Sequence, residues 1–186
     1  HSLPLFFLLV AAELELPAWL AYAPDHSYIR LIDSEGRWQN LELTHVGFVS
    51  NQFMLSSGFV KRDAVLQKTY LDTISYRETV ANCMIDLAGS HGWQLGPSPM
   101  QEQIADQILE FYPNNLFANI LMANTERVRF LKAAQKQGNP PVKDFPKYPD
   151  LDKLYQQFSK RVQRVQSLGY ESLTEAQYRR WLQGVK

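Results

Sequence analysis

The chain reads His26-Ser27-Tyr28-Ile29-Arg30-Leu31-Ile32 and, five residues later, Trp38-Gln39-Asn40-Leu41-Glu42-Leu43-Thr44, and this stretch decides its fold. Polar and apolar residues alternate in both segments, which is the period of a half-buried strand. The connection Asp33-Ser34-Glu35-Gly36-Arg37 has the composition of a hairpin turn, because glycine adopts a positive φ without steric cost. We therefore predict a β-hairpin over residues 26–44.

The loop length determines which side chains share a face of this hairpin. A three-residue loop with a bulge at Gly36 pairs Asp33 with Arg37. His26 and Glu42 are then diagonal neighbours on one face, with Cβ atoms about 7 Å apart or slightly less. A two-residue turn puts them on opposite faces instead. In the first register an imidazole lies beside a carboxylate, which supplies two of the three members of a nucleophile–base–orienter triad.

Length and composition limit the class of protein. The chain has 186 residues, enough for one domain or two small ones with a real core. Its 45% hydrophobic and 20% charged residues are typical of a soluble globular protein. Lysine plus arginine and aspartate plus glutamate number 19 each, so we expect no nucleic-acid partner. The single cysteine, Cys83, excludes an internal disulfide framework and leaves a cytoplasmic and a periplasmic location equally open.

The apolar run Leu3–Ala12 predicts a buried helix. It lacks a basic segment before it, and two glutamates and Pro17 follow it instead of a small-residue cleavage site, which argues against a signal peptide. It is too short to span a bilayer, so we expect no membrane insertion. Ser2 is a suitable N-cap, and Pro17 should end the helix near Leu16. Because the run is apolar nearly all round, the helix should be central.

The amino-terminal part, residues 1–74, is expected to be an α+β layer in which this helix packs on a small antiparallel sheet. Ala18–Ala23 is predicted to be the strand that leads into the hairpin. Residues 46–60 suggest irregular structure with one more short strand. Lys61–Lys68 is predicted to be a short helix.

The remainder of the chain predicts an antiparallel helical layer. Residues 75–136 contain three predicted helices at 76–92, 99–112 and 116–135, with Ser75 and Ser98 as N-caps. Residues 137–150 are rich in proline and are expected to form an extended linker. Residues 151–186 should form two C-terminal helices, the first stopped by Gly169 and the last running from Thr174 to about Gly184.

Three features of the first 44 residues resemble the transglutaminase-like superfamily of papain-like cysteine enzymes. In that family a nucleophilic cysteine heads a buried helix that ends in a Leu-Gly-Ile-Pro-Ala type of motif, to which Leu14-Glu15-Leu16-Pro17-Ala18-Trp19 is similar. A strand then begins with a histidine followed two positions later by an aromatic residue, as His26 and Tyr28 do. The third member of that family's catalytic triad is an aspartate in a Trp-x-x-x-Asp-x-Thr pattern. Trp38–Thr44 matches this pattern with Glu42 at the aspartate position.

This resemblance implies acyl transfer through a thioester, either hydrolysis of a peptide or isopeptide bond or transfer to an amine. His26 would be the general base and Glu42 the residue that orients it. The nucleophilic cysteine would lie immediately or very nearly upstream of His1, so this chain alone should be inactive. The implied partner is a protein or peptide substrate, and no cofactor or metal is required. Four further side chains are expected to line the site: Ser2, Tyr28, Trp38 and Asn40.

The helical part resembles a tetratricopeptide repeat. Met84–Ala88 is similar to the apolar motif of a first helix, and Ile108–Asn115 is similar to the ending of a second helix. Leu116–Phe130 resembles the first helix of the next repeat. This covers about one and a half repeats, too few for a free-standing solenoid, so we expect these helices to dock on the α+β layer.

Other residue types leave weaker alternatives. Cys83 as a displaced nucleophile is disfavoured because it lies in an apolar helical register, where a thiol is inert. Ser2 as a substitute nucleophile is less economical than Ser2 as a helix cap. A metal site is disfavoured because the spacing fits no ligand motif; its members would be Asp25, His26, His45 and His91.

A non-catalytic alternative remains open, in which the chain is a protein-interaction module with helical repeats on an enzyme-like scaffold. An exposed apolar groove on the helices and a blocked pocket beside His26 would favour it. Filling of the helical face by the proline-rich segment and the last helices would remove its surface.

Overall fold

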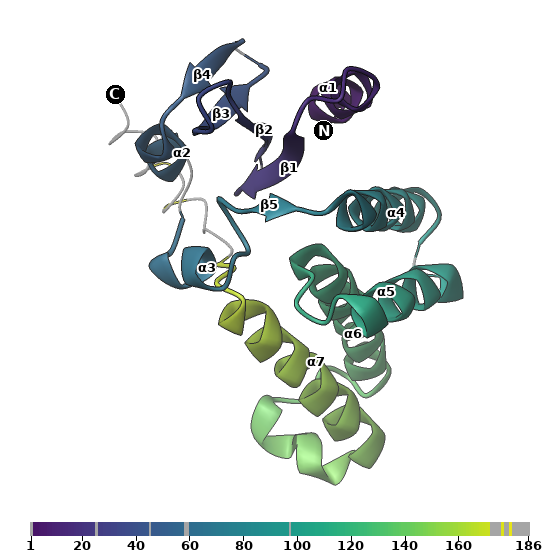
Figure 1. The fold of residues 1–186 in the computed structure, drawn as a ribbon. Helices are drawn as coiled ribbons and strands as arrows, with labels where there is room; N and C mark the ends of the chain where they lie inside the picture. Colours follow the sequence, from purple (N-terminus) through teal and green to yellow (C-terminus); the bar gives the residue numbers. More distant parts are fainter. Residues whose placement is uncertain are drawn as a thin grey trace. The chain divides into compact units, whose positions relative to one another are not determined.

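The structure is a computed structural model that describes residues 2–24, 26–44, 46–57, 60–96 and 98–171, together with Ala176 and Arg179. The chain divides into two compact units, one formed by residues 1–79 with those from Gly169 onward, the other by residues 80–168. The predicted α+β class is confirmed: a helix packs on an antiparallel sheet, and several packed helices follow (Figure 1).

The first unit contains a five-stranded antiparallel sheet with strand order β4-β3-β2-β1-β5 (Figure 1). Its strands are β1 (Ala18–Ala23), β2 (His26–Ile32), β3 (Trp38–Glu42), β4 (Gly47–Val49) and β5 (Thr73–Ile74). The first three correspond to the predicted strand and hairpin. β5 pairs with β1 and was not predicted, because a two-residue strand shows no periodicity.

The predicted hairpin register is confirmed. Arg30 pairs with Asn40 and Ile32 with Trp38 across β2 and β3, and the amide of Asp33 donates to the carbonyl of Arg37 at 3.0 Å. Gly36 has a φ of +77°, the left-handed conformation that the bulge requires. The odd-length loop therefore keeps the even-numbered residues of both strands on one face.

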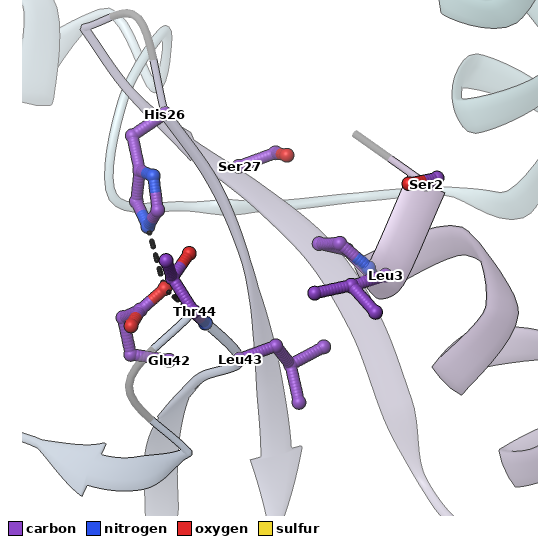
Figure 2. A pocket seen from close by; sticks show the side chains of 8 residues that line it. Ser2, Leu3, His26, Ser27, Glu42, Leu43 and Thr44 are labelled. Carbon is purple, nitrogen blue, oxygen red and sulfur yellow. Dashed lines mark hydrogen bonds and ion pairs between the residues drawn. The ribbon is translucent and has the colours of Figure 1, made fainter.

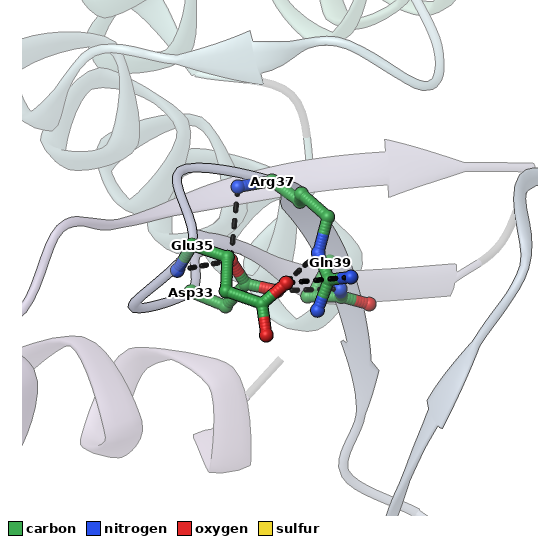
Figure 3. A network of polar contacts seen from close by, with 4 residues as sticks. All are labelled: Asp33, Glu35, Arg37 and Gln39. Atoms are coloured by element: carbon green, nitrogen blue, oxygen red, sulfur yellow. Dashed lines mark hydrogen bonds and ion pairs between the residues drawn. The ribbon is translucent and has the colours of Figure 1, made fainter.

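The Asp33 carboxylate is the centre of the turn (Figure 3). Oδ1 accepts hydrogen bonds from the amides of Glu35 and Arg37, both at 2.9 Å. Oδ2 accepts from Arg37 Nε at 3.1 Å and from Gln39 Nε2 at 2.9 Å. The amide of Arg37 and then the Gln39 side chain hold the pKa of Asp33 well below its usual range. This network specifies the loop.

Helix α1 (Ser2–Glu13) packs on β1 and β2 with one face only. Pro4, Leu8 and Ala11 are buried, whereas Phe6 and Leu9 are 67% and 69% exposed. The predicted helix on the sheet is confirmed, but the expectation that it is central is wrong, because the described elements cover only the side that faces the sheet.

The helix α1 also ends earlier than the predicted position near Leu16. Glu15 has a φ of +54°, and the amide of Leu16 donates to the Ala11 carbonyl at 2.8 Å, which together form a Schellman motif. A glutamate at the left-handed position carries no glycine signal, so the sequence did not reveal this stop.

Residues 46–57 hold more regular structure than predicted. The short strand is present as β4, but Asn51–Ser57 forms helix α2 instead of irregular chain. Met54 of α2 is fully buried against Ala21 and Tyr28 of the sheet, so tertiary packing stabilises a helix that is too short for a periodic signal. Helix α3 (Arg62–Leu66) lies within the predicted Lys61–Lys68 helix.

The second unit is helical. Its elements are α4 (Tyr76–Leu95, which begins in the first unit), α5 (Pro99–Phe111), α6 (Leu116–Lys136), the 3-10 helix η1 (Val142–Lys147) and α7 (Pro149–Ser167). The four α-helices agree with the predicted helices within a few residues. The predicted capping box at Ser75 is confirmed, because its amide donates to Glu78 Oε2 at 3.1 Å and its hydroxyl accepts from the Glu78 amide at 3.2 Å. Alanine, leucine, isoleucine and methionine side chains of α4, α5 and α6 form a core.

The proline-rich segment is not the extended linker that was predicted. Its residues form η1, and Phe145 is buried against Ala134 and Leu151. Phe145 also packs edge-on to Tyr155 of α7, with ring centroids 5.1 Å apart. Proline composition signals the absence of an α-helix but does not reveal one buried aromatic side chain, which here holds the segment on the helices.

Gly169 follows α7 with a φ of +86°, which confirms the predicted helix stop. The predicted last helix, from Thr174 to about Gly184, lies outside the described residues apart from Ala176 and Arg179. Within the part of the chain that the structure describes, no helix combines the length and apolarity needed to cross a bilayer.

Candidate active site

A pocket of about 150 Å³ lies at the end of the sheet where β2 begins and β3 ends (Figure 2). Three segments that are far apart in the sequence form it: the start of α1, the start of β2 and the end of β3 with the two residues after it. Its lining consists of Ser2, Leu3, Pro4, His26, Ser27, Glu42, Leu43 and Thr44. Three of the predicted site residues therefore meet in one pocket, namely Ser2, His26 and Glu42.

His26 and Glu42 are in direct contact. His26 Nε2 lies 3.1 Å from Glu42 Oε1 (Figure 2). The side chain of Glu42 is 5% exposed and that of His26 is 35% exposed. The same Oε1 accepts a hydrogen bond from the amide of Thr44 at 2.9 Å. The prediction that the imidazole and the carboxylate share one face is confirmed, and the carboxylate is desolvated while the ring reaches solvent.

The contact with Glu42 determines which ring nitrogen of His26 is available for chemistry. A carboxylate accepts hydrogen bonds, so we assign the proton of the neutral ring to Nε2. Nδ1 then carries the lone pair, and it has no hydrogen bond to any of the described residues. In Figure 2 this second nitrogen faces Ser27 and the start of α1. The arrangement presents a base toward the interior of the pocket.

The start of α1 forms the opposite wall. The amides at the beginning of a helix have no intrahelical acceptor, and the helix dipole adds a partial positive charge there. Ser2 and Leu3 bring this end of the helix to the pocket, while Pro4 has no amide hydrogen to offer. The pocket thus combines a base with an environment that stabilises developing negative charge.

Tyr28 and Asn40 were expected to line the site and do not. Tyr28 is fully buried beneath α2, its hydroxyl has no hydrogen-bond partner among the described residues, and burial raises its pKa to about 12. Asn40 is buried and donates through Nδ2 to Asn51 Oδ1 at 2.8 Å, so it secures the first residue of α2. Both residues share a sheet face with His26. Helix α2 covers the part of that face where Tyr28 and Asn40 lie, whereas His26 lies at the end of the strand and lines the pocket.

Trp38 also lies outside the pocket, at the turn end of β3. Its ring packs on Trp19, with centroids 5.4 Å apart, and the Arg30 guanidinium lies 4.9 Å from its centroid. The spacing of four residues between Trp38 and Glu42 explains this, because it separates them by about 13 Å along a strand.

The structure places the other residues that were weighed as a nucleophile or as metal ligands as follows. Cys83 lies in α4, outside the pocket. Burial, and to a smaller extent the neighbouring carboxylate of Asp86, raises the pKa of its thiol. Ser2 is the first residue of α1 and lines the pocket. Of the residues weighed as metal ligands, Asp25 and His45 lie outside the described residues, and the described ones contain no cluster of three metal-binding side chains.

Sequence reasoning missed the part that Ser27 and Leu43 play in the lining and the bond from the Thr44 amide to Glu42. Backbone donors leave no trace in residue patterns. Ser27 and Leu43 point to the other face of the sheet by alternation, and they reach the pocket only because it lies around the end of the strands.

Comparison of the chain with models of protein families, with curated proteins and with solved structures found no match.

Proposed function

We propose that this pocket is the base-and-orienter part of a thiol acyl-transfer site. The observation that carries the proposal is the contact between His26 Nε2 and Glu42 Oε1, which leaves Nδ1 directed at the start of α1. A carboxylate that holds an imidazole in one tautomer is the arrangement by which cysteine and serine enzymes activate a nucleophile. The transglutaminase-like pattern of the first 44 residues, which prompted the pairing, supports the same chemistry.

The nucleophile belongs at the amino-terminal end of α1. A cysteine immediately or very nearly upstream of His1 would lie where the helix dipole and the imidazole together favour the thiolate. The thiolate attacks a carbonyl carbon of a peptide or isopeptide, and the developing oxyanion is stabilised at the positive end of the helix. Protonated Nδ1 of His26 then gives its proton to the leaving amine, and a thioester remains on the sulfur.

The second half of the reaction reverses these roles. Neutral His26 removes a proton from water or from an acceptor amine through Nδ1 as that group attacks the thioester. The thiolate leaves, and the product is an acid or a new amide. Glu42 stays ionised in both halves and stabilises the imidazolium through Nε2.

The direct test uses the chain extended by the coding sequence that precedes His1. Acylation by a p-nitrophenyl ester is followed by nitrophenol release and by the mass of the acylated protein. We expect a thioester on an upstream cysteine, and a fall of about 10²–10⁴-fold in acylation rate for His26→Ala. Arg37→Ala, at the turn end of the same hairpin, is the control and should change the rate less than about twofold, since it lies outside the pocket.

Two results would overturn the proposal. One is an upstream sequence without a cysteine near His1. The other is an upstream cysteine whose acylation does not depend on His26.

The non-catalytic alternative has one observation in its favour. Val80, Met84 and Leu87 of α4 are exposed at helical spacing, which makes an apolar stripe. The pocket beside His26 is nevertheless open, and η1 and α7 cover the aromatic face of α6 through Phe145. Selection of an amphipathic-helix peptide library on the wild-type chain tests this function, because peptides specific for the stripe should fail to bind the Leu87→Glu variant.

A further inference from the structure

The outward side of helix α1 carries large apolar side chains that none of the described elements covers. Pro4, Leu8 and Ala11 are buried on the side that packs on β1 and β2. The residues of the opposite side, which we call the α1 stripe, have exposed fractions of between 42% and 69%; they are Leu3, Phe6, Leu9, Val10 and Leu14.

The α1 stripe is continuous along the helix. Its residues recur at intervals of three, four and seven, and a helix with 3.6 residues per turn places such positions on one side. The amide of Leu14 donates to the Val10 carbonyl at 3.0 Å, so the helical path carries Leu14 onto the same side. Residues 2–12 contain no charged side chain. A surface helix normally has a polar outward side, so this side has the composition of an interface.

The α1 stripe is large enough to hold two copies of this chain together. Its side chains leave on the order of 100 Å² open each, so the stripe exposes about 500 Å² of apolar surface. Two such stripes packed on each other remove about 1,000 Å² from water, the size at which specific association begins. A pair with twofold symmetry meets this requirement with a single surface, because each copy supplies the same patch.

The two ends of α1 determine the direction of such a pair. Glu13 is exposed at the carboxyl-terminal end, whereas the amides of the first turn, at Ser2 and Leu3, have no intrahelical acceptor and carry the positive end of the helix dipole. In an antiparallel pair, Glu13 of each copy lies beside the first turn of the other copy. In a parallel pair the two glutamates would lie side by side and repel each other. Electrostatics therefore favour the antiparallel pair, with its twofold axis near Leu9 in the middle of the stripe.

We propose that a second copy of this chain occupies the α1 stripe, in an antiparallel helix pair about a twofold axis. Burial of Phe6, Leu9 and Val10 between the two helices stabilises the pair. Glu13 of each copy fixes its direction. This dimer does not require the proposed acyl-transfer function, and its test needs no nucleophile.

The test is sedimentation velocity of the whole chain at concentrations from about 1 μM to about 100 μM, because small interfaces give weak dimers. We expect a species with twice the mass of one chain that dissociates on dilution. Leu9→Glu should raise the dissociation constant about tenfold or more, since it places a charge in the apolar contact. Leu87→Glu is the matched control and should leave the dimer intact. Leu87 is a leucine of α4 with an exposed fraction of 66%, against 69% for Leu9.

Two further experiments test the direction of the pair. Leu9→Glu and Leu9→Lys should each be monomeric alone and should form a mixed dimer when combined, because opposite charges then meet near the axis. Glu13→Gln should weaken the dimer about threefold, since each copy loses a charge beside a helix amino terminus. Far-ultraviolet circular dichroism verifies that each variant is folded.

A wild-type chain that stays monomeric at all these concentrations would overturn the proposal. Binding of that monomer to phosphatidylcholine vesicles, lost in Leu9→Glu, would make a lipid surface the occupant instead. A dimer that survives Leu9→Glu, or that Leu87→Glu dissociates, would place the interface elsewhere and also overturn it. If the chain extended by the coding sequence before His1 is monomeric, the added segment covers the stripe and a second copy does not.

Discussion

The two ends of the β2–β3 hairpin each hold a carboxylate that accepts hydrogen bonds from backbone and side chain, and the pocket that contains His26 lies at the open end. At the turn, Asp33 accepts hydrogen bonds from two backbone amides and from two side-chain donors, Arg37 Nε and Gln39 Nε2. At the open end, Glu42 Oε1 is in contact with His26 Nε2 and accepts a hydrogen bond from the amide of Thr44. At the turn, both oxygens of the Asp33 carboxylate accept hydrogen bonds. At the open end, Nδ1 of His26 has no hydrogen bond to the described residues.

Solvent separates the two ends further. The Asp33 side chain is 21% exposed and that of Glu42 is 5% exposed. A hydrogen bond to a shielded carboxylate is stronger than the same bond in water, because the local dielectric constant is lower. One hairpin thus uses the same chemistry for two purposes: the hydrogen bonds to Asp33 fix the turn, and the buried Glu42 orients an imidazole.

The largest loss of stability is expected from a substitution in the middle of β2, the strand that contributes to both ends of the hairpin. Ile29 lies between them and is fully buried. Ile29→Ala should lower the free energy of unfolding by about 2–5 kcal/mol, since it leaves a cavity in the sheet core. Urea unfolding followed by tryptophan fluorescence measures this. Ile32→Ala, on the same strand but half-buried, should cost clearly less, and equal costs would show that the core does not connect the ends.

The next effect separates register from packing at the turn. Gly36 has a positive φ, and the space that a methyl group would occupy there is open, so Gly36→Ala should cost about 1–2 kcal/mol of conformational strain alone. Gly47 has equally open space without a positive φ. Gly47→Ala is therefore the matched control and should be close to neutral in the same unfolding measurement. A neutral Gly36→Ala would contradict the bulge as the determinant of register.

A smaller effect is expected in the pH dependence of stability. The hydrogen bonds lower the pKa of Asp33, so its stabilising contribution is present above the ordinary carboxyl range near pH 4 and is lost as the pH falls through the lower folded value. Asp33→Asn should thus be less stable than the wild type at pH 7, and the two should converge at strongly acidic pH. Thermal unfolding across pH measures the gap, which salt should narrow because the site is exposed. A constant gap would contradict the charge as its source.

The smallest effect tests the buried hydroxyl between the ends. Tyr28 OH is fully buried beneath α2 and has no hydrogen-bond partner in the part of the chain that the structure describes. Tyr28→Phe should leave the free energy of unfolding unchanged or raise it by about 1 kcal/mol, because an unsatisfied polar group is removed. It should leave the acylation rate of the extended chain unaltered, since the hydroxyl does not line the pocket. Destabilisation would reveal a hydrogen bond of the hydroxyl in solution.

Much of the first unit was predictable because its signals are local. Alternation in residues 26–32 and 38–42 specified two strands, and the glycine of the turn specified their register. Register alone brought His26 and Glu42 together. Helix α2 and the 3-10 helix η1 were not predictable in this way, because each is secured by one buried side chain, Met54 or Phe145, whose partners lie elsewhere in the sequence.

The hairpin, its pairing and the shared face of His26 and Glu42 follow from residues 26–44 alone, because period two and loop length are properties of neighbouring residues. Three further features depend on tertiary packing: Ser2 and Leu3 line the pocket, α2 buries Tyr28 and Asn40, and the Thr44 amide donates to Glu42. Those outcomes depend on which elements cover the two faces and the end of the sheet. Packing of distant segments sets them, and no local pattern in the chain encodes it.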